Sequence, residues 1–215
     1  MEEIMSEQQI SKLTGSLVEH QRHFGQMSAE DRQWVIQNTT AAIALFAEAM
    51  KNRASSVVKK ILILMTTVKV AAVEHFVAAE KFREGQTTDR VKIALLTDNF
   101  KKNFLGKIEE DVGATELHIH KLDQDSLDAT IIAELGSAAE ITLLNFWELL
   151  KKQGSGQKGD LLTDGCANIA YIRDVSGELW AVSARWIADH DGWFVGARSV
   201  GYPRRWRAGS QVVSH

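Results

Sequence analysis

The spacing of apolar residues changes along the chain, and the first segment has a helical period. Residues 6–24 repeat apolar side chains at near-helical intervals. Ser28, a good N-capping residue, precedes a stripe at alternating steps of four and three. The stripe consists of Val35, Thr39, Ala42, Phe46 and Ala49. The pattern predicts two amphipathic helices, over residues 6–24 and 28–53.

The middle of the chain alternates between strand-like and helix-like segments. Residues 57–73 are rich in β-branched and aliphatic side chains, which predicts one or two strands. We then expect a helix over 74–82, a polar turn over 83–89, a strand over 90–97, a helix from Asp98 or Asn99 to about 110, and a strand over 115–122. Two helices are predicted next, one ended by Gly136 and one capped by Ser137 and running to residue 152.

A polar stretch rich in glycine, residues 154–164, is predicted to be a linker. It would separate a helical and mixed α/β domain, residues 1–153, from an antiparallel Trp-rich β-module, residues 165–215. The two segments could also pack as one unit. The predicted fold class is α+β: N-terminal helices, a mixed α/β middle and a C-terminal antiparallel β-meander.

Beyond the linker the hydrophobic period becomes two, as in strands with one buried face. Trp180 and Trp186 then share a face of one strand, and Trp193 lies on the next. A hairpin with Trp186 opposite Trp193 also pairs Ala184 with Val195, so the register is self-consistent. We expect these three tryptophans to lie in the core.

The composition indicates the class of protein and its cellular compartment, but no activity. The chain has 215 residues, of which 45% are hydrophobic and 25% charged, values typical of globular proteins. Cys166 is the only cysteine, so no intramolecular disulfide is possible. No apolar run is long enough to span a bilayer, and the acidic start is unlike a secretory signal. We expect a soluble cytoplasmic protein with no cofactor and no membrane partner.

Charge is distributed unevenly, although the net charge is only −3. From Gly165 to the end there are six arginines, no lysine and four acidic residues. Arginine without lysine suits planar or bidentate contacts with an anion.

The segment "GYPRRWRAG", residues 201–209, combines the only proline with clustered arginines, which excludes a central strand position. We expect an exposed binding loop there. The candidate binding residues are Tyr202, Arg204, Arg205, Trp206 and Arg207. Aromatic rings beside guanidinium groups suit single-stranded nucleic acid or an anionic partner. In the alternative interpretation Trp206 closes an open end of the sheet and the arginines are solvated.

Glu116, His118 and His120 project from one face of the predicted strand 115–122, a spacing that can hold a divalent metal. The alternative is a solvated strand face, since no third histidine or cysteine follows at a motif spacing.

The pattern "LLTDGCANIAYIRDVSGELWAVSARW", followed by "GWFVGARSVGYPRRWRAGSQVVS", resembles the C-terminal parts of uncharacterised bacterial proteins from candidate-phylum genomes. The resemblance covers roughly residues 68–215. It implies a bacterial origin and a C-terminal Trp-rich β-module, and it assigns no catalytic residue.

These observations favour a non-enzymatic intracellular protein that binds a ligand or a protein partner through the C-terminal sheet and the arginine-rich loop. One alternative is a nucleic-acid-binding protein that uses the same loop. Another is a metal-dependent enzyme built on His118 and His120.

Overall fold

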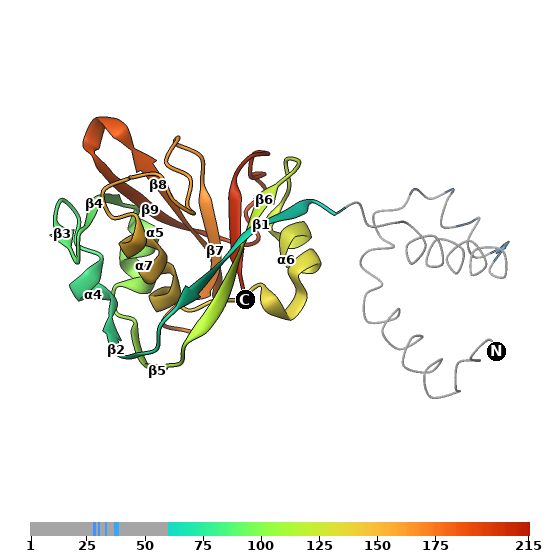
Figure 1. Ribbon diagram of the computed structural model, residues 1–215. Coiled ribbons are helices and arrows are strands. Elements are labelled where there is room, and N and C mark those ends of the chain that lie inside the picture. Colours follow the sequence, from blue (N-terminus) through green and yellow to red (C-terminus); the bar gives the residue numbers. More distant parts are fainter. Residues whose placement is uncertain (1–27, 29, 31–32, 34–36, 39–59) are drawn as a thin grey trace. The chain divides into compact units, whose positions relative to one another are not determined.

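The computed structural model describes residues 60–215 together with Ser28, Glu30, Gln33, Gln37 and Asn38 (Figure 1). Glu30, Gln33 and Gln37 are helical. The predicted helix over 6–24, and most of the one over 28–53, lie outside the described residues. Residues 60–215 form one compact unit.

Eight strands of this unit form one large, mostly antiparallel sheet, in the spatial order β1–β6–β10–β7–β8–β9–β4–β3 (Figure 1). Their bounds are β1 Leu62–Val70, β3 Thr87–Thr88, β4 Val91–Leu96, β6 Thr115–Leu122, β7 Asn168–Arg173, β8 Leu179–Ile187, β9 Gly192–Ser199 and β10 Gln211–Ser214. The pairs β10–β7 and β9–β4 are parallel. A separate antiparallel pair joins β2 (Val73–Val77) to β5 (Ile108–Val112). A mixed α/β fold with a large, mostly antiparallel sheet is therefore confirmed.

The helices of the unit are short, and two of them begin at threonine caps. They are α4 (Ala78–Lys81), α5 (Asp98–Phe104), α6 (Asp128–Leu135) and α7 (Leu143–Lys152). The Thr97 hydroxyl accepts a hydrogen bond from the Phe100 amide, and the Thr142 hydroxyl accepts one from the Asn145 amide. Such caps satisfy backbone donors that the first turn leaves free.

Three predicted helix boundaries are wrong. The expected helix over 74–82 begins as β2, and the expected helix to residue 110 ends at Phe104, because these two stretches pair with each other as β2 and β5. Ser137 does not cap a long helix. It lies in a 3-10 turn, and the Ile141 amide then donates to the Tyr171 carbonyl, which delays α7 until Leu143.

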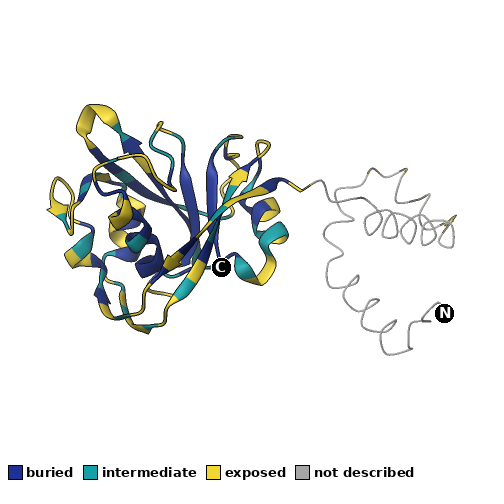
Figure 2. Ribbon diagram, viewed as in Figure 1, coloured by how far each residue is buried: buried dark blue, intermediate teal, exposed yellow. Residues whose placement is uncertain are grey.

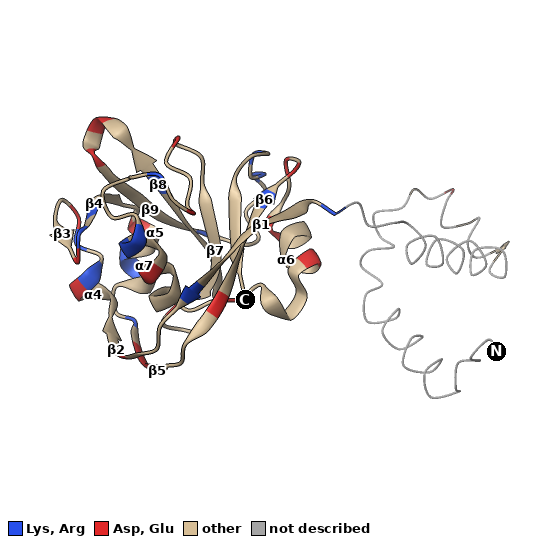
Figure 3. Ribbon diagram, in the orientation of Figure 1, with Lys and Arg blue, Asp and Glu red and all other residues tan. Residues whose placement is uncertain are grey.

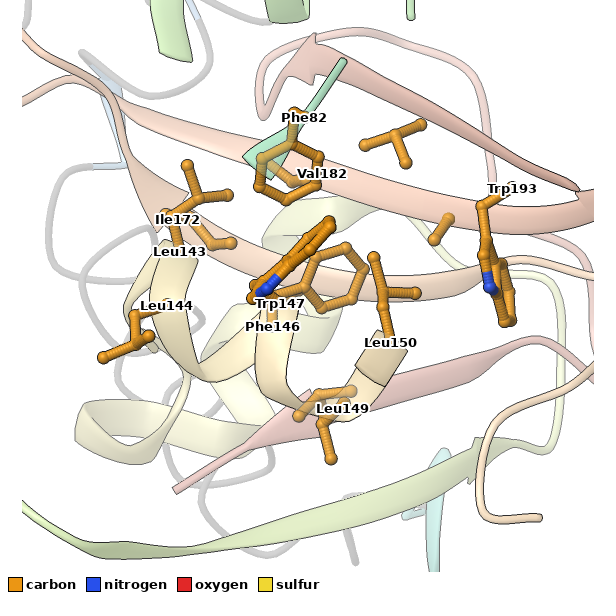
Figure 4. Close-up of a cluster of buried hydrophobic side chains, with 14 of the residues drawn as sticks. Phe82, Leu143, Leu144, Phe146, Trp147, Leu149, Leu150, Ile172, Val182 and Trp193 are labelled. Atoms are coloured by element: carbon orange, nitrogen blue, oxygen red, sulfur yellow. The ribbon is translucent and has the colours of Figure 1, made fainter. Parts of the chain in front are cut away.

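One face of the sheet packs against α4, α5 and α7 to form the main apolar core. Seven of the ten α7 residues are buried, and the ring of Trp147 lies 4.9 Å from that of Phe82 (Figure 4). Residues from β1, β4, β6, β7, β8, β9 and β10 contribute to the same cluster. In Figure 2 the central strands and most of α7 are dark blue, because their residues are buried.

The register predicted for the β-module is confirmed. Trp186 pairs with Trp193, and Ala184 pairs with Val195. Trp186 and Trp193 are buried, with their rings 5.4 Å apart edge to face. Trp180 is only half-buried, and its indole N–H donates to Asp174.

The C-terminal strands share their sheet with the middle of the chain. β10 lies between β6 and β7, and β9 pairs with β4. Segment 154–164 runs from α7 to β7 within the compact unit, and Leu161 is buried in the main core.

Within the described part of the chain, no helix has both the length and the apolar character needed to cross a membrane.

Candidate functional site: an arginine-lined pocket

The described residues cover only part of the second face of the sheet. A smaller apolar cluster joins Ile169 and Tyr171 of β7 to Ile131 of α6. Trp206, from the loop between β9 and β10, belongs to this cluster. Helix α6 and this loop therefore cover one part of the face, whereas the part around Ser183 and Gly196 lines a hollow.

Residues 201–210, called the arginine loop below, are held against the chain that precedes α6. Ser126 and Trp206 exchange two backbone hydrogen bonds of 3.0 and 2.9 Å. The Asp125 carboxylate accepts from the Ala208 amide, and the Asp125 carbonyl accepts from Arg205. The loop is thus ordered by contacts with residues about 80 positions earlier in the sequence.

The expectation that Trp206 is exposed is wrong, because its side chain is 5% exposed. Its indole N–H donates to the carboxylate of Asp128, 2.6 Å away, and the guanidinium of Arg198 lies 3.6 Å from its ring centroid. Trp206 therefore closes the sheet, as the alternative interpretation has it. The other four candidates, Tyr202, Arg204, Arg205 and Arg207, are exposed.

Asp128 organises this part of the second face. The residue is fully buried, and three side chains donate to its carboxylate. They are Tyr171 at 3.0 Å, Arg198 at 3.1 Å and Trp206 at 2.6 Å. Burial and the Asp128 charge raise the pKa of Tyr171 far above its ordinary value, so its hydroxyl remains a donor. A buried carboxylate is stable in a protein only with such partners.

A hollow of about 500 Å³ lies between strands β8 and β9 and the arginine loop. Its floor comes from Ala181, Ser183 and Arg185 of β8 and from Phe194, Gly196, Ala197 and Arg198 of β9. The remaining lining residues are Thr97, Gly165, Cys166, Ala167, Tyr202, Arg204, Arg205, Trp206, Arg207 and Ser210. The volume is typical of sites for small molecules.

Among the residues that the structure describes, five arginines and no acidic residue line this pocket. Figure 3 shows the basic residues of the arginine loop in blue. Arg198 is paired with Asp128, but Arg185, Arg204 and Arg207 make no ion pair with any residue that the structure describes. Partial burial, followed by the charge of Arg204 and the other arginines, lowers the pKa of Arg185. This pocket therefore carries positive charge that the described residues leave largely unneutralised.

Cys166 lines the same pocket and is partly accessible. Burial and the neighbouring Asp164 raise the pKa of its thiol. At neutral pH the side chain is consequently a thiol, and a thiol is a poor nucleophile compared with a thiolate.

The candidate metal residues lie on β6, outside this pocket. His118 Nε2 lies 4.0 Å from Glu116, and His120 Nε2 lies 3.1 Å from the hydroxyl of Ser214. Among the residues that the structure describes, no group of three or more histidine, cysteine or acidic side chains is arranged to hold a metal ion. The geometry thus gives these three residues no shared ligand position.

The structure brings the loop candidates together and adds residues that the sequence did not single out. Arg185, Arg198 and Phe194 form the floor, and Asp128 anchors Arg198. The sequence contains a signal for Arg185 and Arg198, because the period-two alternation places both on the strand face opposite the tryptophans. Asp128 has no such signal, since its role depends on contacts with β7, β9 and the arginine loop.

Comparison with known proteins finds no matching family model and no significant match among curated proteins or solved structures. The function must therefore be inferred from the chemistry of the pocket itself.

Proposed function

We propose that this chain is a binding protein that holds an anionic ligand in the arginine-lined pocket. The observation that carries the proposal is the set of five lining arginines, of which Arg198 alone has a carboxylate partner among the described residues. Guanidinium groups without partners repel one another, and an anion bound between them relieves that repulsion.

Arginine also suits the recognition of a specific anion. Its planar N–H donors match the oxygens of a carboxylate or phosphate in paired hydrogen bonds. Arg185 extends from a strand, and Arg198 is held by Asp128 and stacked on Trp206. Groups held in advance lose less conformational freedom when a ligand binds.

The shape of the site favours a small ligand over a protein or nucleic-acid surface. A hollow of about 500 Å³ is a typical small-molecule site, and its floor is the sheet itself. Nucleic-acid binding by stacking needs exposed rings. Tyr202 is 51% exposed, but Arg198 covers the ring of Trp206, so the loop offers one ring where the nucleic-acid hypothesis expected two.

Binding is favoured over catalysis because the described lining contains no histidine, aspartate or glutamate, the most common groups for proton transfer. Its cysteine is protonated at neutral pH, and its tyrosine, Tyr202, is exposed on the arginine loop.

Cys166 provides a direct test, because it is the only cysteine of the chain and lines the pocket. The experiment compares its alkylation by iodoacetate, which is an anion, with alkylation by neutral iodoacetamide. Both reagents react with the thiolate, so the rate with iodoacetate divided by the rate with iodoacetamide does not depend on the thiolate fraction. This ratio reports the electrostatic potential at Cys166. We expect a ratio several times that of an unstructured cysteine peptide, decreasing in 0.5 M NaCl as salt screens the arginines.

Substitutions identify which arginines produce the electrostatic potential at Cys166. Arg185→Met and Arg207→Met should each lower the ratio, whereas Arg83→Met, an exposed arginine outside the pocket, should not change it. A ratio equal to that of the peptide would contradict the proposal. Tight, steeply salt-dependent binding of a single-stranded oligonucleotide, lost in Arg204→Met, would instead favour the nucleic-acid hypothesis.

A further inference from the structure

A second hollow, of about 220 Å³ and apolar in character, adjoins the arginine-lined pocket. It is lined by Ala94, Leu95, Ile187, His190 and Phe194. Phe194 lines both hollows, so the two share this residue. Leu95, near the end of β4, is 44% exposed.

Strand register explains why charge and apolar surface meet at this point. On β9, Phe194 pairs with Arg185 of β8 on one side and with Leu95 of β4 on the other. Register partners project from the same face of a sheet. A guanidinium, an aromatic ring and an aliphatic side chain therefore lie in a row across three neighbouring strands.

We infer that the ligand of this site is an amphipathic organic anion, with its acid group among the arginines and an aromatic or short aliphatic body on Phe194 and Leu95. The inference rests on the proposed function and adds the chemical class of the ligand. Exposed apolar side chains are common singly, but here they line a hollow that shares Phe194 with a cationic pocket.

No acidic residue of the described part of the chain lines either hollow, so none of these lining groups opposes the entry of an anion. A hydrophilic anion would use the arginines and leave the apolar hollow filled with water. An acid with an apolar body would also displace that water, and each Å² of apolar surface removed from water adds to affinity.

A matched series of carboxylates tests this inference: acetate, benzoate and 2-naphthoate, with neutral 2-naphthamide for comparison. Dissociation constants come from titration calorimetry on the full chain and from protection of Cys166 against iodoacetamide. We expect affinity to increase along the series, with 2-naphthoate binding roughly tenfold or more tighter than acetate. 2-Naphthamide should bind more weakly than 2-naphthoate.

Substitutions separate the contributions of charge and apolar surface. Leu95→Ser should weaken 2-naphthoate several-fold and leave acetate within twofold, because Leu95 lines only the apolar hollow. Phe194→Ala should weaken 2-naphthoate more than acetate. Arg185→Met should weaken both carboxylates. Ile108→Ser removes another exposed apolar side chain, from β5 and outside both hollows, and should change neither.

The outcomes distinguish the inference from the proposed function. If all three carboxylates bind equally, in an arginine-dependent way, the inference is overturned and the proposed function stands. If 2-naphthoate binding depends on Leu95 but not on Arg185, the site recognises apolar ligands and both are overturned. If no carboxylate binds and the iodoacetate ratio equals that of the peptide, both are overturned as well.

Discussion

The two faces of the eight-stranded sheet are built from the same strands but covered in different ways. Helices α4, α5 and α7 seal the first face with a continuous apolar layer. On the second face, α6 and the arginine loop cover one part and leave a charged hollow beside it. Since successive side chains of a strand point to opposite faces, β8 and β9 supply tryptophans to the core and arginines to the pocket.

Polar contacts hold the arginine loop on the second face of the sheet. The arginine loop is held by backbone bonds to Ser126 and by the buried carboxylate of Asp128. Apolar packing spreads stability over many contacts, whereas a buried polar network depends on each of its few members. We therefore expect substitutions on the two faces to differ in both size and kind.

The neighbouring residues Trp193 and Phe194 give the sharpest contrast. Trp193 is fully buried in the main core, whereas Phe194 is half-buried at the pocket. Trp193→Ala should lower the free energy of unfolding by about 3–5 kcal/mol. Phe194→Ala should lower it by about 1 kcal/mol.

The measurement is urea denaturation of the full chain followed by far-UV circular dichroism. Trp193→Phe provides a milder variant if the alanine variant does not fold. Equal effects at the two positions would mean that the second face is as tightly packed as the first.

Asp128→Asn tests the polar network on the second face. The change leaves the partly buried Arg198 without its counter-charge, and we expect unfolding to become easier by about 3 kcal/mol. Tyr171→Phe removes one donor and should cost about 1 kcal/mol. Asp160→Asn, at an exposed carboxylate with no partner among the described residues, is the matched control. A negligible effect of Asp128→Asn in denaturation curves would mean that apolar contacts alone hold the arginine loop.

Arg185→Met should stabilise the folded chain, whereas Trp193→Ala and Asp128→Asn should destabilise it. The variant removes one of several mutually repelling guanidinium groups, and we expect a gain of roughly 0.5 kcal/mol. Added NaCl should stabilise the original chain more than the variant, because salt screens the repulsion. The readout is the urea midpoint at two salt concentrations, with Arg83→Met as control. A clear loss of stability would instead assign Arg185 a structural role.

The smallest expected effect concerns pH and His120. Burial, followed by the charge of His118, lowers the pKa of His120 in the folded chain. The unfolded chain, in which histidine has a pKa of about 6.5, then binds more protons than the folded chain below that pH. Stability should decrease as the pH falls through about 6.5, until His120 is also protonated in the folded state.

His120→Gln should reduce this decrease by a few tenths of a kcal/mol. The check is the melting temperature between pH 7.5 and 5, with His190→Gln at an exposed position as control. An unchanged pH dependence would assign the acid sensitivity to other groups.

Local patterns predicted much of the fold. The alternation along residues 179–199 was sufficient to pair Trp186 with Trp193 and to assign the faces of β8 and β9. The strand over 115–122 was also predicted at its observed bounds. Both results follow from burial on one face, which requires a period of two in the sequence itself.

Local patterns misled where a distant partner decided the outcome. Ser137 and Thr142 are both chemically suitable caps, but the bridge between Glu140 and Tyr171 keeps the chain extended and selects Thr142. Proline and arginine correctly predicted a loop at 201–209. They could not reveal that Trp206 turns inward, because its acceptor, Asp128, lies 78 residues earlier.

The sequence by itself determined the faces of the C-terminal strands, the burial of two tryptophans and the concentration of arginine after residue 165, since each depends on local spacing and composition. Tertiary structure alone decided that β10 lies between β6 and β7, that β9 pairs with β4, and that Arg185, Phe194 and Leu95 form one row. Pairing between distant strands requires a register that no local pattern encodes, and this pairing created the pocket.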